Sequence, residues 1–521
     1  MLSPRPRGIL RLNISGRCWT LPPHSLLQRT ARLITDAATD PDIDLHSRWA
    51  KIVDDGLADS VIASIGDMPV PSLSDIPIAD AVNYAGRDAD ATLRLYPILK
   101  EKVAVMGLER AVDLDISVIP MVSAMCRNGM LVDQTHLAIL NEVFNDNLFD
   151  LESRIYDVVG KRFLITSGDQ VADVLYGDLN LIGQRQTKSR KRLSTDEKAL
   201  QALQGQHPVI PLLLEHREIS KLQSSYVHKL PDLISPDGRI RMELGMSTVP
   251  SGRFNCWGGV NLLAIPVRSE LGREIRRCFI APPGCMMGSL DLNQIELRAL
   301  AILSGDDNMI DAFATGKDLH RLTAASRFHV PFEAVTSDQR QRGKTLNFAI
   351  ANQITAPGLY DQYVVAGIAN VDVGDVQEDI NSWFLTYPGV AKWFDSVYEE
   401  GRRQGYIRSE LAGRILWTPG LRSPIERVES EAKRVATNWK IQTFAQEIIK
   451  MGMAQLWDLM DKEVHVKYLL QVHDELLFED RNGNGPDWGD AITEIVTGAA
   501  PELPIPIIAG MKWASNWAEL K

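Results

Sequence analysis

The chain has 521 residues, of which 45% are hydrophobic and 24% are charged, and its formal net charge is −11. This composition is typical of a globular protein with three or four packed units, and no apolar run reaches the roughly 18 residues that a membrane span requires. The negative net charge argues against nucleic-acid binding over the whole surface, although a local basic surface is sufficient for such binding.

The five cysteines form no Cys-x-x-Cys pair. This pattern predicts reduced thiols, no zinc site and an intracellular setting. The cysteines are Cys18, Cys126, Cys256, Cys278 and Cys285.

Residues 1–35 are rich in arginine and contain no acidic residue. Such a composition is found in organelle transit peptides, and targeting by this segment is one interpretation. We favour the other, a poorly ordered leader, because no amphipathic period is present.

Residues 84–100 (YAGRDADATLRLYPILK) and many segments of residues 109–245 have the apolar spacing of helices. Within the second region, residues 185–192 (RQTKSRKR) are strongly basic. This stretch suits contacts with a nucleic-acid backbone without sequence preference, and a solvated loop is the alternative. Its candidate contact residues are Lys188, Arg190, Lys191 and Arg192.

An aspartate follows a strand-like run in residues 287–300 (MGSLDLNQIELRAL). Ser289 and Leu290 end this run, Asp291 sits at the strand end, and a helix-like stretch begins near Gln294. A carboxylate beside a core is costly unless it is compensated, and a metal ion is the usual compensation.

Residues 338–353 (DQRQRGKTLNFAIANQ) predict a helix with a functional face. Arg340, Lys344, Phe348 and Asn352 are spaced by four residues and therefore lie along one face, roughly 6 Å apart along the axis. Two cations suit a triphosphate, and an aromatic ring one turn further on suits a sugar or a base. The alternative is a solvated basic helix with one core phenylalanine.

Residues 468–479 (YLLQVHDELLFE) predict two buried strands joined by a tight connection that carries Asp474 and Glu475. If Asp474 meets Asp291, two charges about 4 Å apart repel each other by roughly 1 to 4 kcal/mol. Mg²⁺ reverses the sign of this interaction and binds phosphate oxygens. A solvated hairpin tip is the alternative.

In order and separation, these segments resemble the three polymerase motifs of the DNA polymerase I family (family A). The sequence resembles phage members of this family. The motifs correspond to residues 291–298 (DLNQIELR), 340–348 (RQRGKTLNF) and 472–475 (VHDE). Residues 251–255, 261–268, 317–320 and 434–442 are similar to further segments of the family, and the resemblance runs from about Pro77 to the C-terminus.

The resemblance implies an α+β, mostly helical right-hand polymerase fold, with a palm sheet, helical fingers and a helical thumb. Tyr84 and Asp88 resemble the last motif of the family's 3′→5′ exonuclease, but the two preceding motifs are absent from residues 1–83, so we expect a truncated exonuclease domain without proofreading. The expected divisions are a leader (1–35), the exonuclease-like segment (36–108), thumb (109–245), first palm part (246–305), fingers (306–438) and second palm part (439–521).

The implied activity is that of a DNA-directed DNA polymerase, a nucleotidyltransferase of DNA replication or repair that takes primer-template DNA and dNTPs. Asp291 and Asp474 would hold two Mg²⁺ ions, with Glu475 in support and Lys344 as proton donor to pyrophosphate.

The resemblance also implies which residues bind the two substrates. Arg340, Lys344 and His320 would meet the dNTP phosphates, while Glu296 and Phe348 would exclude a ribose 2′-hydroxyl. Arg253, Asn438 and Gln442 would reach the minor groove, where the acceptors are common to all base pairs. The remaining expected DNA contacts are Arg434, His473 and Asn352.

The chain departs from the family pattern at three places. Asn352-Gln353 replaces Tyr-Gly, Leu292-Asn293 replaces Tyr-Ser, and Leu263-Ala264 replaces Gln-Asn. None of these changes removes a candidate metal ligand or phosphate cation. They predict a lower-fidelity or specialised enzyme.

Two other functions are compatible with the same segments. A single-subunit RNA polymerase shares the palm and both acids, but Glu296 with Phe348 argues against it. A catalytically idle DNA-binding accessory protein would be favoured if an acid were missing, and both are present. We expect a monomer in the cytoplasm of a bacterial or phage-infected cell, with accessory partners undefined by the sequence.

Overall fold

The computed structural model describes residues 10–14, 17–21, 78–183, 186–187, 192–267, 269–368, 371–460, 466–480, 483 and 485–520. Most of the expected leader lies outside these residues, as do Lys188, Arg190 and Lys191 and the side chain of Tyr84. The chain divides into two compact units, Met1–Met106 and Gly107–Lys521.

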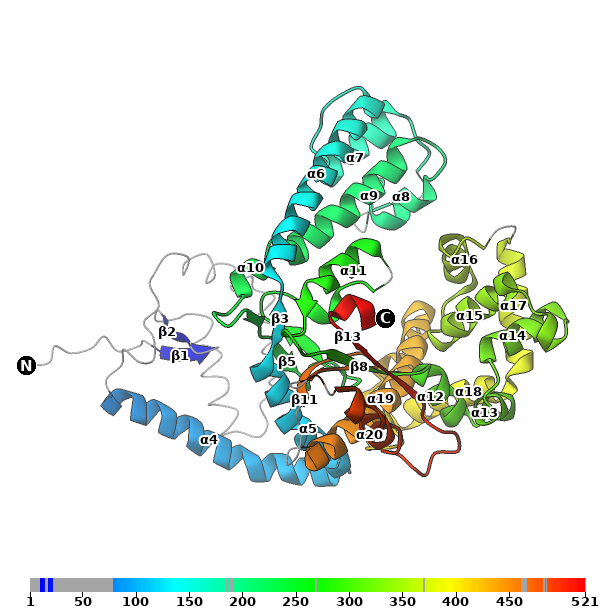
Figure 1. Ribbon diagram of the computed structural model, residues 1–521. Coiled ribbons are helices and arrows are strands. Elements are labelled where there is room, and N and C mark those ends of the chain that lie inside the picture. Colours follow the sequence, from blue (N-terminus) through cyan, green and yellow to red (C-terminus); the bar gives the residue numbers. More distant parts are fainter. Residues whose placement is uncertain are drawn as a thin grey trace, which may run out of the picture. The chain divides into compact units, whose positions relative to one another are not determined.

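The described residues of the first unit form a hairpin and one long helix (Figure 1). Strands β1 (Leu10–Ile14) and β2 (Arg17–Leu21) pair antiparallel. Helix α4 (Ile78–Val105) contains the predicted helix 84–100, and Asp88 is exposed on it.

The second unit is built around a four-stranded antiparallel sheet with the order β11-β12-β8-β13. Its strands are β8 (Met287–Leu292), β11 (Val466–Val472), β12 (Glu475–Asp480) and β13 (Ala509–Ala514). Strands β8, β11 and β12 are buried along almost their whole length, as their apolar runs predict.

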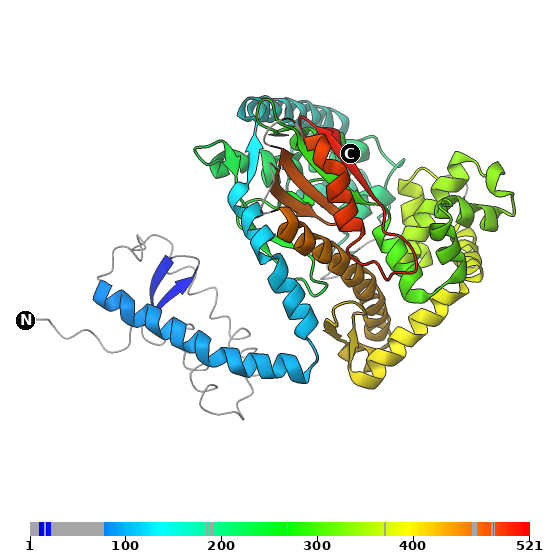
Figure 2. The same ribbon diagram turned by 60° about the horizontal axis from the view of Figure 1, so that its bottom comes forward.

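Helices α19 (Glu426–Met460), α20 (Gly485–Thr497) and α5 (Glu109–Asn128) pack around this sheet (Figure 2). Helix α5 falls in the predicted thumb region, residues 109–245. It contacts α19 and β11, and Asn128 Nδ2 donates to the carbonyl of Tyr468 at 2.9 Å. The buried face of α5, which includes Val118, Met121 and Met125, explains this placement.

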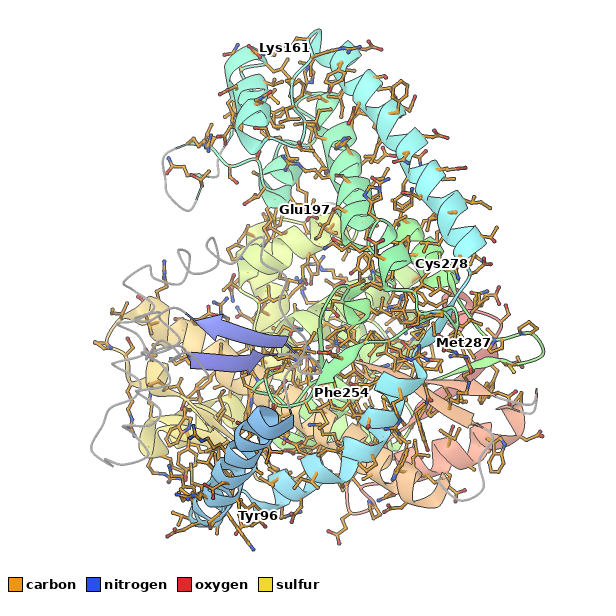
Figure 3. All side chains as sticks on the ribbon, turned by 90° about the vertical axis from the view of Figure 1, so that its left-hand side faces the viewer. Tyr96, Lys161, Glu197, Phe254, Cys278 and Met287 are labelled. Carbon is orange, nitrogen blue, oxygen red and sulfur yellow. The ribbon has the colours of Figure 1, made fainter. Side chains whose placement is uncertain are left out.

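The predicted helices of the thumb region are present and form a projecting helical body (Figures 1 and 3). Helices α6 (Gln134–Val159) and α9 (Val209–Leu222) pack together, and Figure 3 labels Lys161 at the tip, just beyond α6. The shorter elements are α7 (Gly168–Ala172), the π-helices Asp173–Asp178 and Gln223–Val227, α8 (Glu197–Ala202) and α10 (Leu230–Leu233).

Two small sheets and two short helices lie between this body and the central sheet along the chain. Strand β3 (Met130–Val132) pairs with β4 (Arg239–Ile240) and β7 (Phe279–Ile280), and β5 (Glu243–Gly245) pairs with β6 (Asn255–Trp257). The 3₁₀ helix Leu262–Ala264 and α11 (Glu270–Arg277) follow β6.

The predicted fingers region is largely helical. Helix α12 (Ile295–Ser304) lies at the end of the predicted first palm part. The predicted fingers region contains α13 (Asp307–Ala314), α14 (Leu319–Phe328), α15 (Ser337–Ala351), α16 (Ala356–Val365), α17 (Val373–Thr386) and α18 (Pro388–Gln404). A hairpin of β9 (Tyr406–Arg408) and β10 (Ile415–Trp417) and the 3₁₀ helix Pro419–Arg422 lead into α19.

The predicted α+β, mostly helical fold class is confirmed. Within the described part of the chain, no helix has both the length and the apolar character of a membrane span.

Candidate active site

Two carboxylates meet at one end of the central sheet. Asp291, in β8, stands opposite Glu475 of β12 on one side and Gly510 of β13 on the other. Asp474 lies in the two-residue turn between β11 and β12, where its carbonyl accepts a hydrogen bond from Leu292 N at 3.0 Å. His473 makes this turn possible because it adopts a positive φ of 55°.

The electrostatics of this turn indicate a cation site. Burial, followed by the negative charges of Asp291 and Glu296, raises the pKa of Asp474 to about 6. Among the described residues, no group of three or more His, Cys, Asp or Glu side chains could hold a metal. Two carboxylates completed by water and substrate phosphates nevertheless form a donor set that Mg²⁺ accepts. Asp291 and Asp474 therefore fit this ion.

Glu475 has a different environment from Asp474. The sequence predicts both acids on the connection between the strands, but Glu475 is the first residue of β12 and is buried, with 2% of its surface exposed. Its Oε1 accepts a hydrogen bond from Ser289 Oγ at 2.5 Å, and its charge acts on the buried guanidinium of Arg276. Ser289 on the neighbouring strand β8 and Arg276 of α11 therefore hold this carboxylate.

Helix α15 presents the predicted cationic and aromatic face. A capping box at Thr336 starts the helix, with Gln339 as its partner. Arg340 forms an ion pair with Asp318, Nε to Oδ2 at 2.5 Å, and Asp318 also caps the first turn of α14. The ring of Phe348 lies 5.7 Å from that of His320, between centroids. The structure thus brings the basic helix and His320 together.

The tautomer of His320 is fixed by a residue that sequence reasoning missed. The Oδ1 of buried Asn347 accepts hydrogen bonds from Thr323 Oγ1 at 2.9 Å and Trp383 Nε1 at 2.6 Å. Its Nδ2 must then be the atom that faces His320 Nδ1, 3.0 Å away, so the ring proton is on Nε2.

The same imidazole is held neutral. Burial lowers the pKa of His320 to about 4; Asp318 opposes this shift, while the charges of Arg340 and Lys344 add to it. No periodic signal in the sequence marks Asn347, because its partners lie on other helices.

Arg253 and Glu296 form an ion pair beside Asp474. Both side chains are about a quarter exposed. Burial, followed by the positive charge of Arg253, lowers the pKa of His473 in the turn. The structure therefore places the expected minor-groove residue and the expected sugar-excluding residue in contact at the edge of the acidic site.

Four predicted DNA contacts surround one hollow of about 380 Å³, which Ser251 and Trp439 also line. They are Asn352, Arg434, Asn438 and Gln442. Asn438 Nδ2 donates to the carbonyl of Asn352 at 3.4 Å, and Arg434 pairs with Glu431. Arg192 lies outside this cluster, exposed just before α8 and paired with Asp169.

Comparison with known proteins agrees with this arrangement. The model of "DNA polymerase family A" matches residues 134–519. DNA polymerase I of Pseudomonas aeruginosa is 34% identical over 450 residues, which are 85% of this chain and 48% of the relative. The thermostable DNA polymerase I of Thermus aquaticus is 33% identical over 428 residues, which are 82% of this chain and 50% of the relative.

The chain thus spans about half the length of these relatives. A solved structure, the POL domain of Pol1 from M. smegmatis in complex with DNA primer-template and dNTP, is similar with a TM-score of 0.77. Its sequence is 31% identical, and the match covers 82% of this chain and 75% of that chain. With most of its length matched by the family model, the chain belongs to DNA polymerase family A.

Proposed function

We propose that the protein is a template-directed DNA polymerase that adds dNTPs to a primer 3′-hydroxyl. The observation that carries the proposal is the electrostatic coupling of Asp474 to Asp291 at the end of the sheet. The POL domain of Pol1 supports it, because that similar structure is a complex with primer-template and dNTP.

In the proposed reaction, the primer 3′-oxygen attacks the α-phosphorus of the dNTP. A bond forms between them, the bond to the bridging oxygen of the β-phosphate breaks, and pyrophosphate leaves. Asp291 and Asp474 would hold two Mg²⁺ ions, whose chemistry is to lower the pKa of the hydroxyl and to neutralise the phosphates.

Side chains from α14 and α15 would bind and protonate the triphosphate. Arg340 neutralises charge, and neutral His320 donates a hydrogen bond from Nε2–H, the nitrogen left free by Asn347. Lys344 is the proton donor to the leaving pyrophosphate. Lys344 forms no ion pair with another described residue, so its ammonium is available to a phosphate.

The proposed role of Phe348 is to help select the sugar of the incoming nucleotide. We expect Phe348→Tyr to raise the use of ddNTPs relative to dNTPs by about tenfold or more, since a phenolic hydroxyl restores a hydrogen-bond partner near the missing 3′-hydroxyl. Competitive incorporation of each ddNTP against its dNTP measures the ratio. An unchanged ratio, with normal dNTP use, would place Phe348 away from the sugar.

A primer-extension assay with Mg²⁺ tests the function directly. We expect extension of a labelled primer with dNTPs, little extension with rNTPs, and no shortening of a 3′-mismatched primer. Efficient use of rNTPs would favour the RNA polymerase alternative, and DNA binding without extension would favour an idle accessory protein. Shortening of the mismatched primer would contradict the absence of proofreading. We further propose that the enzyme acts as a cytoplasmic monomer.

A further inference from the structure

A second hollow continues the one that Asn352 and Gln442 line. Its volume is about 590 Å³, and it lies between the end of the β9–β10 hairpin and the first turns of α19. The two hollows share Glu431, Arg434 and Val435, so they lie next to each other, and together they are here called the hairpin groove.

The outer half of the hairpin groove combines an aromatic face with cations. The ring of Trp417 is 61% exposed, yet an edge-to-face contact with Tyr406, at 5.5 Å between centroids, holds it in place. Arg427 and Arg434 also line the groove. Residues 401–435 contain eight Arg or Lys and four Glu residues, so this segment is positive in a chain of net charge −11.

We propose that the hairpin groove holds the unpaired template strand ahead of the primer end, with one base stacked on Trp417. Exposed aromatic faces bind bases of any sequence, and nearby cations follow the phosphates. A strand that passes Asn352 and Gln442 in the first hollow reaches Trp417 in the second by following the protein surface, since the two hollows are adjacent. The inference rests on the proposed polymerase function and extends it to the single-stranded part of the substrate.

The test compares the affinity for primer-templates with a one-nucleotide and an eight-nucleotide 5′ overhang, in wild type, Trp417→Ala and Trp417→Phe. Stacking of one base contributes about 1 to 3 kcal/mol, so wild type should prefer the long overhang by about fivefold or more. Trp417→Ala should lose this preference with unchanged affinity for the short overhang, and Trp417→Phe should retain most of it.

A matched control and a spectroscopic signal complete the experiment. Trp257, on β6, is half exposed, and Trp257→Ala should keep the overhang preference. A 2-aminopurine in the overhang should be quenched by wild type and less by Trp417→Ala.

An equal preference in wild type and Trp417→Ala would overturn the proposal, as would an equal loss of affinity for both overhangs. Wild type that extends primers but shows no overhang preference would overturn the groove proposal alone. Wild type that binds no primer-template would overturn the proposed function, and the groove proposal with it.

Discussion

Replacing Asp474 with asparagine should reduce primer extension at least a thousandfold, which corresponds to about 4 kcal/mol of lost transition-state stabilisation. The amide keeps the size of the side chain but removes one of the two charges that face each other at the end of the sheet. Single-turnover extension over a range of Mg²⁺ concentrations measures the loss.

The same substitution should stabilise the metal-free protein at neutral pH. The pKa of Asp474 is raised from its ordinary value of 3.8 to about 6 in the folded protein. The folded state therefore holds this proton more tightly, and the associated stability is present below pH 4 and is lost as the pH rises through about 6. The loss above pH 6 is on the order of 2 to 3 kcal/mol.

Thermal denaturation in EDTA and in Mg²⁺ separates these effects. In EDTA, Asp474→Asn should melt above wild type at pH 8 and close to it at pH 4. Mg²⁺ should raise the melting temperature of wild type at pH 8, less so at pH 5, and leave Asp474→Asn nearly unchanged.

Asp490→Asn, the same change at an exposed position on α20, is the matched control and should alter neither activity nor metal response. Substantial extension by Asp474→Asn, or an undiminished response to Mg²⁺, would remove Asp474 from the metal site.

The parts of the site that the sequence predicts are those encoded by local pattern. Apolar runs interrupted by an acid place Asp291 in a buried strand and Asp474 in a turn, and four-residue spacing places Arg340 and Phe348 on one helix. The position of Glu475 depends on where the turn ends, which the same pattern leaves open.

Contacts between distant segments could not be predicted in this way. Asn347 reaches His320 across 27 residues, and Asp318 reaches Arg340 across 22. These contacts exist because α14 packs against α15, and helical periodicity describes one helix at a time.

The packing of α5 against α19 and β11 could not be predicted from helical periodicity either. Its apolar spacing predicts a helix but not the surface on which the helix packs. Asp115 on α5 forms ion pairs with Arg414 and with fully buried Lys450 of α19, both at 2.7 Å, and these charges give no periodic signal.

A buried carboxylate holds the fingers helices together. Asp379 of α17 has no exposed side-chain surface and forms ion pairs with Arg327 of α14, at 2.5 Å, and Arg342 of α15, at 2.7 Å. The hydroxyl of Tyr363, on α16, donates to Asp379 Oδ2 at 2.7 Å. One side chain therefore connects four helices, including the helix that carries Arg340, Lys344 and Phe348.

We expect Asp379→Asn to lower the free energy of unfolding of this region by about 3 to 5 kcal/mol, because two largely buried guanidinium groups lose their counter-charge. Hydrogen exchange of α14 to α17 measures the local loss without assuming that the whole chain unfolds in one step. Extension should weaken as well, since Arg342 helps to fix the orientation of α15.

The neighbouring residue provides the control for this change. Glu378 also pairs with Arg327, at 3.3 Å, but its side chain is 72% exposed, so Glu378→Gln should cost less than about 1 kcal/mol. Equal effects of the two substitutions would mean that burial of Asp379 contributes nothing beyond a surface ion pair. A large loss confined to Asp379→Asn would instead make this carboxylate the structural support of α15, because Glu378→Gln removes one exposed ion pair, whereas Asp379→Asn removes two largely buried ones.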